Sequence, residues 1–340
     1  MRFLPTDEQS DFARTLRSLL GSAQVPATVR AWADGEHGPG RALWSRLAGT
    51  GLFALAAPEP YEGLGLLPLE LSLGFVELGR AGVPGPVVES AAASVLLSEL
   101  GTVLDEELAK RFVPGLASGA TSATLTLPGG GPYALDADAA THCFTVSPAG
   151  ELRLAAGRGE LLASTDPARR LYRPAPDGEL LAAGPAVVAA AETALHWARL
   201  LTAAQCLGVG EALLARTVEY AKQRTQFAAP IGSFQAVKHR LADTLLALEF
   251  ARPLVWAAAL SPAAPDVAAA KLSAGEACYR AAMTALQLHG AVGYTEELDL
   301  SLWLRKARPL RDAWGTPSAC RAEVLRSRAG EGAPVTPARG

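Results

Sequence analysis

The stretch Arg224-Thr-Gln-Phe227-Ala-Ala-Pro230-Ile-Gly232-Ser-Phe234-Gln235 is the most informative part of this sequence. It joins two helical patterns through a turn. A guanidinium at a helix end can bind a pyrophosphate bidentately, Phe227 offers a stacking face, and Gln235 can donate to an anion or a base. A dinucleotide phosphate would suit this arrangement. The alternative is a surface Arg beside two aromatic rings, Phe227 and Phe234, that close a helix hairpin.

Outward from this stretch, the chain divides into two helical blocks that flank a block of short apolar runs separated by Gly, Pro and Asp clusters. This order predicts an α+β fold that is mainly α. The predicted parts are an N-terminal helical domain (1–119), a middle β domain (120–186), a C-terminal helical bundle (187–329) and a flexible tail (330–340).

Composition limits the classes of function. The 340 residues are 49% hydrophobic and 19% charged, which is typical of a globular protein with a large core. The 31 basic and 34 acidic residues give no broad positive field, so neither nucleic acid nor an anionic membrane is an expected partner. Met1–Gln9 lacks the apolar core of a signal peptide, and apolar stretches such as Leu180–Ala191 are too short to span a bilayer. We therefore expect a cytoplasmic protein without a membrane span.

Cysteine and histidine spacing predicts no metal site. No two cysteines form a CxxC pair, and no histidine has a second ligand at a helix-face spacing. We expect the cysteines to act as small buried apolar residues. They are Cys143, Cys206, Cys278 and Cys320.

Two shorter stretches lie further along the chain. Gln287-Leu-His-Gly290-Ala-Val-Gly293 follows a long helical pattern and places two glycines where main chain can approach a ligand closely. The alternative is a helix C-cap at Gly290 and a turn at Gly293. Trp314-Gly-Thr316 indicates a turn with an N-cap before the last helix.

These stretches, in this order and spacing, resemble the C-terminal domain of acyl-CoA dehydrogenases, which use FAD to remove two hydrogens from an acyl-CoA. The segment 51–65, from Gly51-Leu-Phe-Ala to Gly63-Leu-Gly65, looks like the N-terminal helical domain of that family. The resemblance implies an N-terminal helical domain, a middle β domain and a C-terminal four-helix bundle. It also implies a dimer or tetramer with FAD across a subunit interface.

The resemblance assigns contacts with FAD to six positions. Arg224 matches the pyrophosphate-binding Arg, Phe227 its neighbour beside the ADP part, and Thr316 a Thr near the diphosphate. In the family this set serves the FAD seated in the neighbouring subunit. The implied FAD-binding residues are Arg224, Phe227, Gln235, Gln287, Gly290 and Thr316.

The chain departs from the family at the catalytic base. Removal of the α-proton needs a carboxylate. The family places that Glu before a Gly-Thr pair, where this chain has Trp314, or on the first long helix of the C-terminal domain, where it has Ala198. We therefore expect no catalytic residue in this chain and a closed substrate slot. The middle domain is about half the family's usual length, and 126–131 alone matches the stretch that holds flavin and substrate.

This contrast predicts a division of labour. The chain resembles the non-catalytic subunit of actinobacterial α2β2 acyl-CoA dehydrogenases that act on steroid side chains. A homologous partner would supply the Glu and the acyl-CoA pocket, and electron-transferring flavoprotein would be the electron acceptor. Two alternatives stay open: a self-sufficient flavoenzyme with a relocated base such as Glu192 or Glu296, and a flavin-free scaffold.

Overall fold

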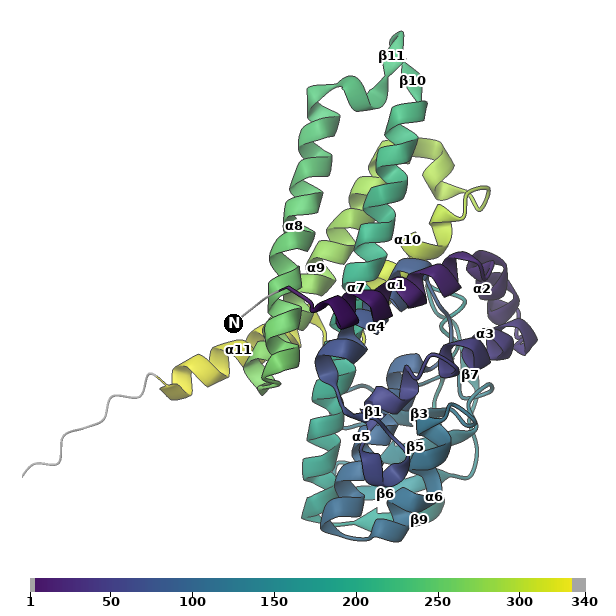
Figure 1. Cartoon of the computed structure of the whole chain (residues 1–340), viewed down its shortest axis with the longest axis vertical. Helices are drawn as coiled ribbons and strands as arrows, with labels where there is room; N and C mark the ends of the chain where they lie inside the picture. Colours follow the sequence, from purple (N-terminus) through teal and green to yellow (C-terminus); the bar gives the residue numbers. More distant parts are fainter. Residues whose placement is uncertain (1–3, 332–340) are drawn as a thin grey trace, which may run out of the picture.

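The computed structural model describes residues 4–331, which form three consecutive parts of the chain; α5 and α6 of the first part lie beside the strands of the second (Figure 1). The N-terminal part is helical, with only a short β1–β2 ladder in it. α4 and α5 are its buried centre, because their apolar residues face other helices on nearly every side. The helices are α1 (Asp7–Gly21), α2 (Val25–Ala33), α3 (Gly38–Ala48), α4 (Pro68–Ala81), α5 (Val87–Val103) and α6 (Glu106–Ala117), and the strands are β1 (Ala56–Ala57) and β2 (Gly65–Leu66).

The middle part holds two small sheets. The larger has the order β3-β5-β6-β9, with β3 parallel to β5 and the other pairs antiparallel. The smaller has the order β4-β8-β7. The strands are β3 (Ala123–Thr126), β4 (Ala134–Leu135), β5 (His142–Val146), β6 (Glu151–Ala155), β7 (Leu161–Leu162), β8 (Leu171–Tyr172) and β9 (Gly178–Ala183).

The C-terminal part is a helical bundle built around one long helix. α7 has 39 residues and runs from the β sheets to a hairpin at the opposite end of the molecule (Figure 1). The hairpin strands β10 and β11 join it to α8. The elements are α7 (Pro185–Gln223), β10 (Thr225–Gln226), β11 (Ala229–Pro230), α8 (Gln235–Leu260), α9 (Ala264–His289), α10 (Leu300–Asp312) and α11 (Pro317–Glu331).

Small residues let α7 cross the N-terminal helices closely. A Cβ at Gly208 would lie 1.9 Å from the carbonyl oxygen of Val76, and a Cβ at Gly79 would lie 2.2 Å from that of Gln205. Only glycine fits at this α4–α7 crossing. α7 is also long and apolar enough to cross a membrane, but 83% of its apolar window is buried inside the protein, as in a core helix.

The mainly α fold class is confirmed. Among the short apolar runs of the middle block, 123–127, 142–146 and 151–154 form strands β3, β5 and β6. The predicted domain limits at 119 and 186 stay predictions. Helix α6 ends at Ala117, two residues before the first limit, and α7 begins at Pro185, next to the second. All but the first two residues of the predicted tail, 330–340, lie outside the described residues.

Phe234, Val237, Leu241, Leu245 and Leu248 recur at steps of three and four, a spacing that predicts one apolar stripe on α8, and the structure differs from it. Leu248 on that stripe is fully buried, but Leu245 is 48% exposed. Leu246, Phe250 and Leu254 extend an outer apolar face that no other described element of this chain covers. α8 thus carries two apolar faces, and the outer one marks a candidate surface for contact with another subunit.

Candidate functional site

The conspicuous hairpin between α7 and α8 forms the first part of the candidate site. Phe227 and Ala228 occupy its two-residue turn with φ of 52° and 60°, the conformation of a type I′ turn. Neither is a glycine, so the backbone there is strained. Phe227 is nevertheless 90% exposed, and its ring meets that of Phe234 edge-on at 6.2 Å. Packing within this chain does not explain an aromatic ring in that position.

Arg224, Gln235, Gln287 and Gly290 lie at the same end of the bundle as the hairpin. Arg224 caps α7 and Gln235 begins α8. The end of α9 is tied to the end of α7 by a stack of Tyr220 on His289, with ring centroids 4.1 Å apart. The structure therefore brings together five of the six predicted FAD-binding residues. We call this group, Arg224, Phe227, Gln235, Gln287 and Gly290, the arm.

The arm fits an anionic dinucleotide. All five residues are exposed, and within residues 4–331 no carboxylate pairs with Arg224. Gly290 is the C-cap of α9 with φ 63°, which confirms the structural alternative for this glycine, and a Cβ there would meet no atom within 4 Å. The exposed main chain at Gly290 and the unpaired guanidinium of Arg224 lie at the same end of the bundle, where they can contact the ADP part of FAD.

Thr316 lies apart from the arm. Its hydroxyl caps α11 and accepts from the amide of Ala319 at 3.3 Å, as the sequence indicates. The loop before it is bonded to Arg199, which precedes Arg224 by 25 residues of α7, or about 38 Å of helix. Thr316 therefore cannot act beside Arg224 within one copy of the chain.

Two buried cations hold the loop that contains Trp314. Arg199 on α7 donates from Nε to the carbonyl oxygen of Trp314 at 2.8 Å, and its Nη1 is 2.6 Å from Glu323. Lys271 on α9 donates to the carbonyl oxygens of Arg311 at 2.7 Å and Gly315 at 3.4 Å. Trp314 itself has φ 59°, a strained value for a bulky residue. The surroundings thus fix the loop in one position.

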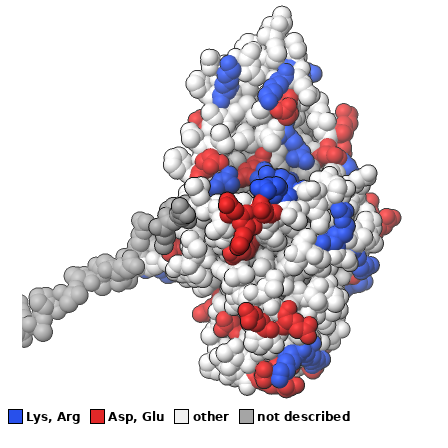
Figure 2. Space-filling view, viewed as in Figure 1, with Lys and Arg blue, Asp and Glu red and all other residues white. Residues whose placement is uncertain are grey.

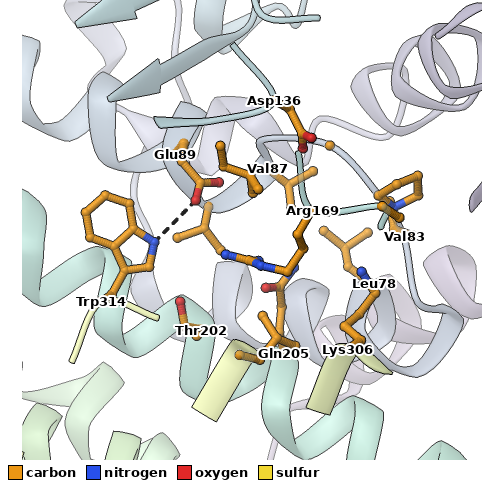
Figure 3. A pocket seen from close by; sticks show the side chains of 17 residues that line it. Leu78, Val83, Val87, Glu89, Asp136, Arg169, Thr202, Gln205, Lys306 and Trp314 are labelled. Carbon is orange, nitrogen blue, oxygen red and sulfur yellow. Dashed lines mark hydrogen bonds between the residues drawn. The ribbon is translucent and has the colours of Figure 1, made fainter. Parts of the chain in front are cut away.

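The Trp314 ring fills the place where the sequence predicts a closed slot. The indole is 6% exposed, and its N–H donates to Oε1 of Glu89 at 3.3 Å (Figure 3). A Cβ at Gly130 would lie 2.5 Å from the ring, so this glycine packs directly against it. The remaining cavity has a volume of about 20 Å³, room for one water molecule. Neither an isoalloxazine nor an acyl chain fits there.

Two buried carboxyl groups in this cavity are not evident from the sequence patterns. Burial raises the pKa of Glu89, and it raises the pKa of Asp136 to about 7 against hydrogen bonds from Trp32 and the Arg170 amide. The Arg169 side chain reaches between them (Figure 3). Glu89 could have been singled out from the sequence, because it is a charged residue inside the apolar run of α5. Asp136 lies in a turn, where an Asp is common, so nothing in the sequence indicates that it is buried.

Asp136→Asn should change how stability depends on pH. The carboxyl binds a proton more tightly folded than unfolded, so its contribution to stability is present below pH 4 and is lost as pH rises to about 7. Relative to wild type, the variant should therefore gain about 2 to 3 kcal/mol of unfolding free energy between pH 5 and pH 8. Urea denaturation at both pH values measures this. The same change at exposed Asp177 should give no gain, and an equal gain there would contradict the assignment.

The relocated bases considered from the sequence do not lie in the cavity. Glu192 is exposed on α7. Glu296 is exposed and hydrogen-bonded to Arg305, which lowers the pKa of its carboxyl. Ala198, the second family position for the base, is fully buried on α7. None of these three positions offers a carboxylate beside the Trp314 loop.

The described residues contain no group of three or more His, Cys, Asp or Glu that could hold a metal ion. Their four cysteines are free thiols; three are buried as predicted, and Cys143 is half-buried. On the face drawn in Figure 2, basic and acidic side chains are interspersed, and the hairpin end is mostly uncharged.

The chain matches known proteins along nearly its whole length. The acyl-CoA dehydrogenase N-terminal domain matches residues 6–120 and the C-terminal domain matches residues 188–328. Acyl-CoA dehydrogenase IpdE2 of Mycobacterium tuberculosis is 33% identical over 95% of this chain and 96% of its own.

Solved structures agree with these matches. A chain of the ChsE4-ChsE5 complex from Mycobacterium tuberculosis superposes with a TM-score of 0.84 at 26% identity, over 98% of this chain and 100% of that one. A variant of the Tcur3481-Tcur3483 steroid acyl-CoA dehydrogenase gives 0.84 at 26% identity, over 96% and 99%. This chain therefore belongs to the acyl-CoA dehydrogenase family of oxidoreductases.

Proposed function

We propose that this chain is the non-catalytic subunit of a heteromeric FAD-dependent acyl-CoA dehydrogenase. It supplies the arm for the ADP part of FAD, while a homologous partner supplies the catalytic Glu and the acyl-CoA pocket. The observation that carries this proposal is the contrast between an open arm and a slot filled by Trp314.

The chemistry of the reaction supports the same division. FAD, when bound, accepts a hydride from the β-carbon, and a carboxylate must take the α-proton. Trp314 and Ala198 cannot take a proton. What this chain can do is bind: Arg224 can pair with a pyrophosphate, and Phe227 can pack against the ADP part. Thr316, far from the arm, would contact the diphosphate of a different FAD.

The proposed substrate, assembly and electron acceptor are inferred mainly from similar proteins. A steroid side-chain CoA thioester is the proposed substrate, because a steroid acyl-CoA dehydrogenase is among the similar structures at 26% identity. An α2β2 assembly is proposed because the ChsE4-ChsE5 structure is a complex and because α8 exposes an outer apolar face. Electron-transferring flavoprotein is the proposed acceptor by family resemblance. We place the assembly in the cytoplasm, since the apolar helix α7 belongs to the core.

Purification of the chain alone and after co-expression with a candidate partner tests the proposal. We expect flavin absorbance and acyl-CoA-dependent activity only in the mixed assembly, with about one FAD per two chains. A lone chain that is yellow and active would instead establish a self-sufficient enzyme. An active mixed assembly in which FAD binds without contact to this chain would indicate a scaffold.

A further inference from the structure

Arg216 on α7 is a half-buried guanidinium that no described carboxylate neutralises by direct contact. It lies over the indole of Trp303 with its central carbon 3.7 Å from the ring centroid. Burial lowers the pKa of Arg216, and Asp299 opposes this only through a longer-range attraction. Asp299 is itself paired with Arg30 at 2.6 Å. Within residues 4–331, the N–H donors of Arg216 have no hydrogen-bond acceptor.

The indole beneath Arg216 is itself fixed. Trp303 is 2% exposed, and its N–H donates to the carbonyl oxygen of Arg80 at 3.0 Å. A guanidinium stacked on a fixed aromatic face keeps its N–H groups in one plane, ready for a planar anion. Burying a guanidinium without a charged partner costs free energy, and an anionic ligand bound to Arg216 would offset that cost.

Arg216 and Trp303 line a cavity of about 320 Å³ between α1, α2, α4, α7 and α10. Two further arginines, Arg17 and Arg80, reach it, but both are bonded to Glu77. Arg80 also pairs with Glu211, so Arg216 is the guanidinium of the described lining that has no carboxylate partner. The remaining wall is largely apolar, with contributions from Leu20, Val25, Pro26 and Ala81.

We propose that this cavity binds a small amphipathic carboxylate, with the anionic group on Arg216 and the apolar body against the Leu20 and Val25 wall. Among the side chains of the described lining that carry N–H donors, only the Arg216 guanidinium and the Gln24 amide donate to no described acceptor of this chain, and only the guanidinium is charged. The volume is at the lower end of small-molecule sites, which suits a compact ligand. The site is separate from both the arm and the Trp314 slot and does not depend on the role proposed for either.

Calorimetric titration with sodium octanoate, using the chain in the assembly in which it purifies, tests this site. Octanoate should bind, 1-octanol should bind at least about tenfold more weakly, and Arg216→Met should weaken octanoate binding by a similar factor. Arg308→Met on the same helix as Trp303 is the matched control, because Arg308 is exposed and lines none of the described cavities; it should leave binding unchanged.

A second variant tests the cavity without touching Arg216. A Cβ at Gly21 would meet no atom within 4 Å, so Gly21→Phe can place a ring at the cavity mouth without a clash in α1. It should also reduce octanoate binding. Absence of octanoate binding to wild type, equal binding of octanol, or full binding by Arg216→Met would overturn the proposal.

Discussion

Trp314→Ala should lower the unfolding free energy by about 3 to 5 kcal/mol, the largest loss of stability we expect from a single change in this chain. The indole is buried and packs against Gly130. Its removal leaves a cavity and takes the N–H donor away from buried Glu89. Urea denaturation measures the loss.

Two companion measurements separate the causes. Trp314→Phe keeps one six-membered aromatic ring but removes the N–H and part of the indole volume, so it should cost less, about 1 to 3 kcal/mol. In the mixed assembly, Trp314→Ala should leave turnover unchanged at a temperature where it stays folded, because the reacting groups belong to the partner. A loss of turnover from the folded variant, or a destabilisation below about 1 kcal/mol, would show that Trp314 does not simply fill an unused slot.

Arg224→Ala should weaken FAD binding by the mixed assembly about 30-fold or more. Arg224 has no carboxylate partner within the described residues, so its removal should act on the cofactor and hardly on folding. Flavin absorbance after dialysis, together with a thermal denaturation curve, separates the two effects.

A conservative change and a neighbouring charge provide the controls for Arg224. Arg224→Lys should recover part of the binding, because an ammonium keeps the charge and loses the bidentate geometry. Arg240→Ala removes an exposed charge on α8 near the arm and should leave FAD content unchanged. Full FAD content in Arg224→Ala would remove the arm from the proposed function.

The elements with a strong local signal were predictable from the sequence. Apolar spacing and proline and glycine punctuation gave the helical blocks and three of the four strands of the larger sheet, but not β9. The cap at Gly290 followed from local sequence in the same way. A turn between α7 and α8 was also predicted, from Pro230 and Gly232, but the two-residue hairpin turn lies at Phe227 and Ala228. Each of these features depends on residues close together in the chain, which is the range over which sequence patterns are informative.

The buried contacts between helices were less predictable from the sequence, because they join segments that are far apart in the chain. Glu89 and Trp314 are 225 positions apart and meet only through the packing of α5 against the C-terminal part. The stack of Arg216 on Trp303 likewise joins α7 to α10, and neither residue stands out locally. On α8, the sequence could not tell a face that packs within the chain from one left for another subunit.

The length of α7 has a consequence for how this chain can diverge. One uninterrupted helix connects the Trp314 loop, through Arg199, to Arg224 at the arm. A one-residue insertion between them would rotate the arm by about 100° about the helix axis and shift it by about 1.5 Å. The hairpin would then point away from its former direction. Relatives that keep the arm should therefore tolerate substitutions along this helix far better than insertions or deletions, with changes in length confined to the loops.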